Sequence, residues 1–188
     1  MNTKFFFLFF LLLGLSIGMQ AREYTFIPEK SVLKWNGKKV TGEHYGKVAL
    51  KSGELTLDKD RIITGNFIID LRTITCEDLP EGEWNDKLVG HLKSDDFFGV
   101  NRYPEAVLKI KGSSPLSNGV FKVQADLTIK GITKPVEFEA RKSEKGFSAL
   151  VTVDRSEYNV RYGSGKFFQN LGDNLIYDNF TLDVELSE

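Results

Sequence analysis

The chain of 188 residues is predicted to be an all-β protein, an antiparallel barrel of about eight strands with one short helix. Three observations support this fold class. Apolar and polar residues alternate with a period of two through most of the chain. Gly, Asn and Asp separate the alternating runs, and a single short run has the spacing of a helix. A parallel α/β sheet would show continuous apolar strands between helices instead.

The alternating runs define the strands in chain order. From Phe121 to Lys130, for example, Phe, Val, Ala, Leu and Ile alternate with charged or polar residues. Four turns are predicted, at Lys51-Ser52-Gly53, Asp58-Lys59-Asp60, Ser117-Asn118-Gly119 and Lys145-Gly146. The predicted strands are Val32–Val40, Lys47–Lys51, Glu54–Asp58, Ile63–Thr73, Ala106–Lys111, Phe121–Lys130, Val136–Arg141, Phe147–Val153 and Phe180–Leu186.

The one predicted helix is Asn85–Lys93, in which Leu88 and Leu92 lie one turn apart with His91 beside them. One-sided strands joined by short loops form either a sandwich or a closed barrel. The long runs 63–73 and 119–131 favour the barrel, because closure removes exposed strand edges.

Residues 1–21 have the pattern of a secretory signal peptide. Lys4 provides the positive charge, Phe5 to Leu13 is an unbroken apolar run, and Met19-Gln20-Ala21 offers a cleavage site. The alternative is an uncleaved membrane anchor. No other segment approaches the roughly 18 apolar residues of a spanning helix. We therefore expect residues 22–188 to form one domain, periplasmic or secreted.

Charge and cysteine content exclude some partners and leave others open. The formal net charge is −1, and the absence of a dominant sign argues against nucleic acid as a partner. The single cysteine, Cys76, cannot form an internal disulfide. It is either a buried, inert side chain or a free thiol.

The catalytic inventory is poor. Two histidines without an H-x-x-x-H or Cys-rich spacing do not predict a metal site. Ser31 and Lys34 spell S-x-x-K, but in a strand their side chains point in different directions. Gly163-Ser164-Gly165-Lys166 lacks the leading glycine of a P-loop. These observations predict a protein that is not an enzyme.

The segment 88–108, LVGHLKSDDFFGVNRYPEAVL, and the segment 126–138, DLTIKGITKPVEF, together resemble the signature of the YceI-like family of secreted lipid-binding barrels. Three further segments agree, namely 42–46 (GEHYG), 154–158 (DRSEY) and the last strand FTLDVEL. The resemblance covers the chain after the signal peptide, in order.

The resemblance implies a lipocalin-like antiparallel barrel that holds an elongated lipid in an apolar tunnel. Isoprenoid lipids such as quinones or polyprenyl phosphates are the implied ligands, together with other long-chain lipids, and no cofactor or metal is implied. Many relatives begin with Asp-x-x-His-Ser, whereas here Pro28-Glu29-Lys30-Ser31 lacks the His and His44 stands in Gly42-x-His44-x-Gly46. The candidate ligand-binding residues are Trp35, His44, Phe67, Ile69, His91, Leu92, Phe97, Phe98, Leu108, Leu127, Ile129, Phe138, Phe167 and Phe168.

The predicted function is therefore that of an exported carrier or buffer of an isoprenoid-type lipid. His91, Leu92, Phe97 and Phe98 are expected in the helix and loop near the barrel opening, with the Phe167-Phe168 pair as a second wall of that opening. Two alternatives remain: a fully packed structural or interaction barrel, and an enzyme that acts on a hydrophobic substrate. The oligomeric state stays open, a homodimer included.

Overall fold

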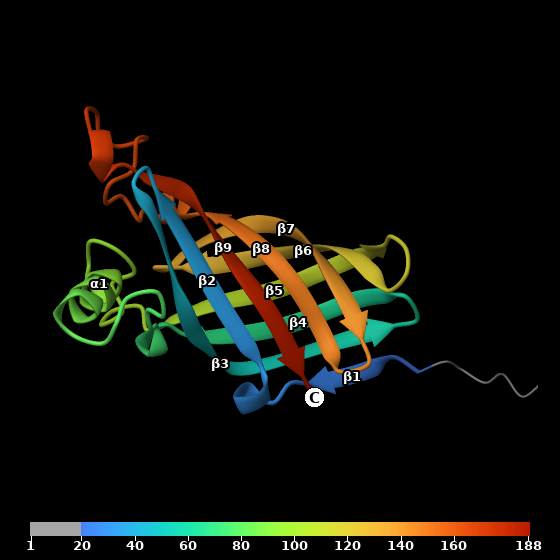
Figure 1. Cartoon of the computed structure of the whole chain (residues 1–188). Helices are drawn as coiled ribbons and strands as arrows, with labels where there is room; N and C mark the ends of the chain where they lie inside the picture. Colours follow the sequence, from blue (N-terminus) through green and yellow to red (C-terminus); the bar gives the residue numbers. More distant parts are fainter. Residues whose placement is uncertain (1–19) are drawn as a thin grey trace, which may run out of the picture.

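The computed structural model describes residues 20–188, which form an antiparallel β-barrel with one α-helix (Figure 1). Nearly all of the predicted signal peptide lies outside these residues. The strands are β1 (Arg22–Thr25), β2 (Val32–Lys39), β3 (Gly42–Asp58), β4 (Arg61–Asp70), β5 (Glu105–Pro115), β6 (Val120–Ile129), β7 (Ile132–Ser143), β8 (Gly146–Asp154) and β9 (Ile176–Ser187).

Strands β2 to β9 pair with their neighbours in sequence, and β2 pairs with β9 to close the barrel. The short β1 pairs with residues 54–57 of β3, so it extends the sheet without being one of the eight strands that close the barrel. The predicted fold class, a closed eight-stranded antiparallel barrel with one helix, is confirmed.

The length of β3 differs from the prediction. Instead of two strands separated by a turn at Lys51-Ser52-Gly53, residues 42–58 form one strand of 17 residues. Its first half pairs with β2 and its second half with β4, and the register shifts between Leu50 and Ser52. Gly53 lies against the ring of Phe67. A bulge followed by glycine lets a long strand bend around the barrel, so the turn-like residues mark a bend.

Strand β4 is shorter than predicted, because a one-turn 3-10 helix, η2 (Leu71–Thr73), follows Asp70. The Asp70 carboxylate accepts hydrogen bonds from the backbone N–H of Arg72 (3.0 Å) and from its guanidinium (2.8 Å). This cap ends the strand and starts the link to the helix. The hydrogen bond from Arg72 holds the pKa of Asp70 below its ordinary value.

Helix α1 (Glu83–Lys93) lies between β4 and β5 in sequence and at one end of the barrel in space (Figure 1). Leu92 is buried and Leu88 packs against the core. The helix ends at Ser94, whose backbone N–H and hydroxyl both donate to the carbonyl of His91. We call this end of the barrel the α1 end. No helix within residues 20–188 combines the length and apolar character needed to cross a membrane.

The opposite end, called the β1 end, is closed by aromatic rings. The ring of Phe147 packs edge-on against Tyr24 (5.2 Å) and Phe26 (5.9 Å), and Phe26 stacks on Phe67 (5.8 Å). The ring centroid of Phe121 lies 6.5 Å from that of Phe147. Strand β1, which contributes Tyr24 and leads into Phe26, was not among the strands predicted from the sequence.

Candidate functional site

The interior of the barrel holds an apolar cavity of about 180 Å³. Side chains from all eight barrel strands line it, because every second residue of each strand points inward. An engineered apolar cavity of roughly 150 Å³ in another protein stays dry and binds benzene. The barrel is therefore not completely filled, and its interior has the size and chemistry to hold an apolar group.

Ten of the predicted residues lie on the wall of this cavity, and four of them, Trp35, Phe98, Leu108 and Phe138, are partly exposed. Trp35 on β2 donates its indole N–H to the Thr75 carbonyl (2.9 Å), which fixes the ring at the edge of the cavity. The rings of Phe97 and Phe98 lie edge to face at 5.3 Å, between α1 and β5. The ten are Trp35, Phe67, Ile69, Leu92, Phe97, Phe98, Leu108, Leu127, Ile129 and Phe138.

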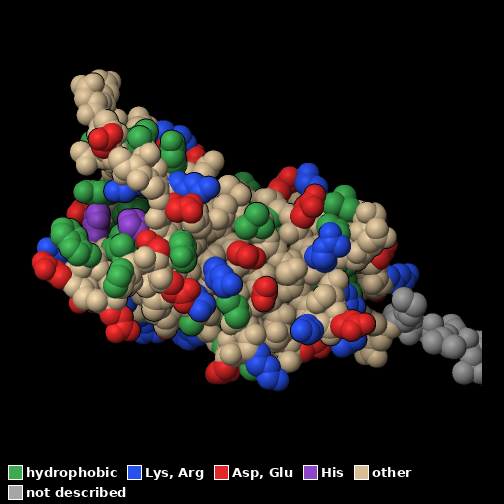
Figure 2. Space-filling model, viewed as in Figure 1, with side chains coloured by type: hydrophobic (Ala, Val, Ile, Leu, Met, Phe, Trp, Pro, Cys, Tyr) green, Lys and Arg blue, Asp and Glu red, His purple; other side chains and the backbone are tan. Residues whose placement is uncertain are grey.

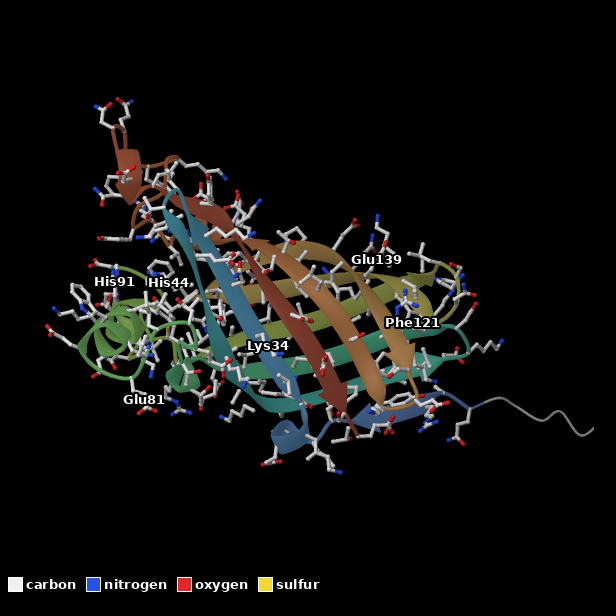
Figure 3. The ribbon with its side chains drawn as sticks, viewed as in Figure 1. Lys34, His44, Glu81, His91, Phe121 and Glu139 are labelled. Atoms are coloured by element: carbon white, nitrogen blue, oxygen red, sulfur yellow. The ribbon has the colours of Figure 1, made fainter. Side chains whose placement is uncertain are left out.

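The structure places the other four predicted residues outside the cavity wall. His91 lies on α1 with its ring 4.3 Å from that of Tyr162, and His44 lies on β3 beside Asp78. Both histidines stand at the α1 end (Figure 3). Phe167 and Phe168 are exposed at 40% and 49% in the link between β8 and β9. Ligand contact by any of the predicted residues remains a prediction.

Arg155 was not predicted from the sequence, yet among the described residues it is the one charged side chain on this cavity wall. It is 2% exposed, donates to the carbonyl oxygens of Val160, Ile176 and Tyr177, and lies 3.5 Å from the Asp178 carboxylate, which compensates its charge. Its guanidinium carbon lies 5.4 Å from the ring centroid of Phe97. A cation so placed at the α1 end gives one end of an apolar cavity a polar character. The only sequence feature that could have pointed to Arg155 is its position directly after an alternating strand, in the segment DRSEY.

A polar depression lies outside the barrel, next to the link that carries Phe168. Lys130, in the turn between β6 and β7, donates to the Asp95 carbonyl (3.0 Å). Burial lowers the pKa of Lys130. Arg102 pairs with the Asp95 carboxylate at 3.4 Å, so positive and negative groups compensate each other here.

One cluster has the residue types of a nucleophile and a base. Lys166 Nζ donates to Asp154 Oδ2 (2.6 Å) and to Ser156 Oγ (2.9 Å), and the Ser156 hydroxyl donates to Asp154 Oδ1. The hydrogen bond with Asp154 raises the pKa of Lys166, so the ammonium keeps its proton and cannot activate Ser156. Asp154 also accepts from the backbone N–H of Ser156. The cluster caps the 3-10 helix η3 (Arg155–Tyr158) and has a structural role.

The outer face of the barrel carries interspersed Lys, Arg, Asp and Glu, without a field of one sign on the visible side (Figure 2). Cross-strand ion pairs such as Lys122–Glu137 (2.9 Å) and Lys51–Glu105 (2.5 Å) account for part of this pattern. Such a face is typical of a solvated strand surface.

The model of the YceI-like domain family matches residues 24–187. A UPF0312 protein of Vibrio parahaemolyticus is 29% identical over 134 residues, which span 68% of this chain and 67% of the relative. Protein YceI of Shigella flexneri is 26% identical over 137 residues, which span 68% and 69%. For a UPF0312 protein of Pseudomonas putida (27% identical over 131 residues) the match covers 64% of the relative, just under two thirds of its length.

Two solved structures have the same fold. Burkholderia cenocepacia BcnA superposes with a TM-score of 0.68 at 19% identity, covering 87% of this chain and 99% of that one. A polyisoprenoid binding domain from Saccharophagus degradans gives a TM-score of 0.57 at 16% identity, covering 86% and 95%. Identities this low show the common fold alone. The family match extends over almost all of residues 20–188, and the chain belongs to the YceI-like family.

Proposed function

We propose that this protein is an exported binding protein that holds an elongated isoprenoid-type lipid in its barrel and acts as its carrier or buffer. The observation that carries the proposal is the apolar cavity inside a closed barrel, with a single arginine near one end. The polyisoprenoid binding domain of Saccharophagus degradans has the same fold, which supports the ligand class. Quinones and polyprenyl phosphates are the specific candidates.

The physical basis of binding is buried apolar area. Each five-carbon prenyl unit taken out of water contributes roughly 3–4 kcal/mol, at about 0.8 kcal/mol per CH₂. Three units contribute roughly 9–12 kcal/mol, which gives about micromolar affinity when the association cost lies near the low end of its range of about 4–15 kcal/mol. The cavity of about 180 Å³ admits one small apolar group as it stands. A longer chain therefore requires side chains of the wall to move, and Phe98 and Trp35 at the partly exposed edge are the ones we expect to do so.

Arg155 gives the proposed site a direction. An apolar chain gains most when it lies along the strands toward the aromatic β1 end, since that end is dry. A charged or quinone head group then lies at the α1 end, within the range of the Arg155 guanidinium.

The proposal is tested by native mass spectrometry of protein purified from its own cell envelope, with extraction of the bound lipid. The delipidated protein is then titrated with polyprenyl phosphates of increasing length, a quinone with the same side chain, and a fatty acid. Affinity should increase with each prenyl unit until the chain fills the barrel. A folded, delipidated protein that binds none of these lipids would overturn the proposed function.

Export is the second part of the proposal and has its own test. N-terminal sequencing of the protein recovered from the cell envelope or the medium should give a first residue near Arg22. A protein that begins at Met1 would contradict removal of residues 1–21, whatever the outcome of the lipid titration.

A further inference from the structure

Three side chains with metal-binding atoms meet at the α1 end of the barrel, away from the cavity wall. They are His44 on β3, and Cys76 and Asp78 on the link between η2 and α1. His44 and Asp78 are 34 residues apart in sequence, so no motif joins them. One ligand atom from each of the three lies within 4.8 Å of the other two.

The local backbone brings the link onto β3. The N–H of Thr75 donates to the Lys47 carbonyl (2.9 Å) and that of Glu77 to the Tyr45 carbonyl (2.8 Å), so the link continues the sheet beyond β4. Gly46 permits this approach, because a Cβ atom there would overlap the Thr75 carbonyl oxygen. The side chains of Cys76 and Asp78 consequently lie beside His44.

Asp78 is the centre of the cluster. Its Oδ2 accepts from His44 Nδ1 at 2.7 Å, and its Oδ1 accepts from the Cys76 thiol at 3.2 Å and from the Tyr45 backbone N–H at 2.9 Å. Asp78 is held in place by a backbone contact that needs neither the thiol nor the imidazole.

We propose that His44, Cys76 and Asp78 form a binding site for a divalent cation of the zinc type. A thiolate, an imidazole and a carboxylate are all ligands of Zn²⁺, and a thiol excludes Mg²⁺ and Ca²⁺ as the preferred ions. In tetrahedral coordination the ligand atoms are roughly 3.3–3.6 Å apart, from bond lengths of about 2.0–2.3 Å. The present distances run to different oxygens of Asp78, 2.7 Å from Oδ2 to His44 Nδ1 and 3.2 Å from Oδ1 to Cys76 Sγ, and one ligand atom of each residue lies within 4.8 Å of the others. The side chains therefore have to shift when they close on one ion.

The charges and protons of the site balance. The Cys76 thiol loses its proton to solvent when the ion binds, and the neutral His44 imidazole moves its single ring proton from Nδ1 to Nε2, which frees the Nδ1 lone pair for the ion. The thiolate and the Asp78 carboxylate together carry two negative charges, which neutralise a divalent ion. Three protein ligands leave the fourth tetrahedral position for water. The His44 side chain is 31% exposed, which gives an ion access from solvent.

The surroundings of the cluster hold the ligands in place without competing for the ion. The side-chain amide of Asn85 on α1 donates to the Cys76 carbonyl (3.1 Å) and to the Leu79 carbonyl (2.9 Å). The neighbouring Glu77 is already paired with Lys47 at 2.7 Å. A site whose backbone is fixed before the ion arrives loses little conformational entropy on binding.

The test uses purified, reduced protein and Co²⁺, a spectroscopic substitute for Zn²⁺. Binding by Cys76 should produce a thiolate-to-cobalt charge-transfer band together with strong visible d–d bands, and added Zn²⁺ should remove both. Cys76→Ser keeps a hydroxyl donor for Asp78 and should abolish the charge-transfer band. Asp78→Asn keeps an acceptor for the Tyr45 N–H and should weaken Zn²⁺ binding by at least about tenfold, since even outer-shell partners of a metal contribute this much.

His91→Gln is the matched control, because His91 is the other histidine at the α1 end and lies outside the cluster. It should leave the cobalt spectrum and the Zn²⁺ affinity unchanged. Melting temperatures confirm that each variant is folded. A folded parent protein without a charge-transfer band overturns the proposal, as does Zn²⁺ binding that Cys76→Ser leaves unaltered. The test involves no lipid, so its result is independent of the proposed function.

Discussion

Leu127→Trp distinguishes a barrel with room for a ligand from one that is fully packed. Leu127 lies on β6, directly opposite Leu108 on β5, and both side chains face the cavity. It is 6% exposed, so a larger side chain at this position has to enter the interior. The indole extends from the wall into the space that a lipid chain would occupy.

A fully packed barrel and a barrel with ligand space predict different losses of stability and of lipid affinity for Leu127→Trp. In a filled core, overpacking destabilises by about 1–3 kcal/mol, which lowers the melting temperature of a domain of this size by roughly 2–12 °C. A cavity of about 180 Å³ exceeds the roughly 150 Å³ that admits benzene, so the added ring should fit and cost under about 1 kcal/mol. Displacing one prenyl unit removes about 3–4 kcal/mol of binding, or two to three orders of magnitude in affinity.

The assay pairs the melting temperature of the delipidated protein with the affinity for a fluorescent prenyl probe. The expected result is a small change in stability together with a large loss of binding. Gln124→Trp, on the outer face of the same strand, is the control and should change neither quantity. A large drop in melting temperature with unchanged probe binding would refute the tunnel and leave a packed barrel.

Three further predictions concern the rest of the barrel. Gly46→Ala should destabilise by about 1–3 kcal/mol in a thermal melt, because the new Cβ displaces the Thr75 carbonyl, whereas Gly37→Ala meets nothing within 4 Å and should be nearly neutral. Burial raises the pKa of the Asp154 carboxyl, but the hydrogen bonds that the carboxylate accepts outweigh burial, and the pKa lies below the ordinary value of 3.8. The ionised carboxylate therefore stabilises the folded protein above pH 3.8, and this stabilisation disappears as the pH falls through the lowered pKa. In melts at several pH values, Asp154→Asn should therefore differ most from the parent near neutral pH, and a constant difference down to pH 2 would contradict this. Cys76 is buried and burial raises its pKa, so a bulky thiol reagent should react slowly with native protein and rapidly after unfolding; rapid labelling of the native state would contradict the burial.

The strands and the cavity wall were predictable because both depend on local periodicity. An alternation of apolar and charged residues, as in β6, determines which side chains point inward once the sheet is closed, and so Leu127 and Ile129 were identified as wall residues. A strand as short as β1 has a single buried residue, Tyr24, and shows no period. Turn-like residues at the Ser52 bulge are ambiguous, since a bend and a turn favour the same residue types.

The polar features were not predictable, because they depend on contacts between distant segments. The burial of Arg155 depends on the carbonyl groups of Val160, Ile176 and Tyr177, which accept from its donors, and on the Asp178 carboxylate at 3.5 Å. A charged residue without such partners would be expected at the surface. The cluster around Asp78 likewise exists only once the link after η2 lies along β3, and no spacing in the sequence records that contact.

The pairing of β2 with β9 has a consequence for how the protein folds. Every other pairing among the eight barrel strands joins strands that follow one another in sequence, whereas this pairing joins residues 32–39 to residues 176–185. The seven pairings between successive strands can form as the chain emerges, but the barrel cannot close until its last strand is available. Until then two strand edges are exposed to other chains. A truncation that removes β9 should therefore yield an aggregating open sheet, and fusions at the C-terminus need a linker that leaves this strand free to complete the barrel.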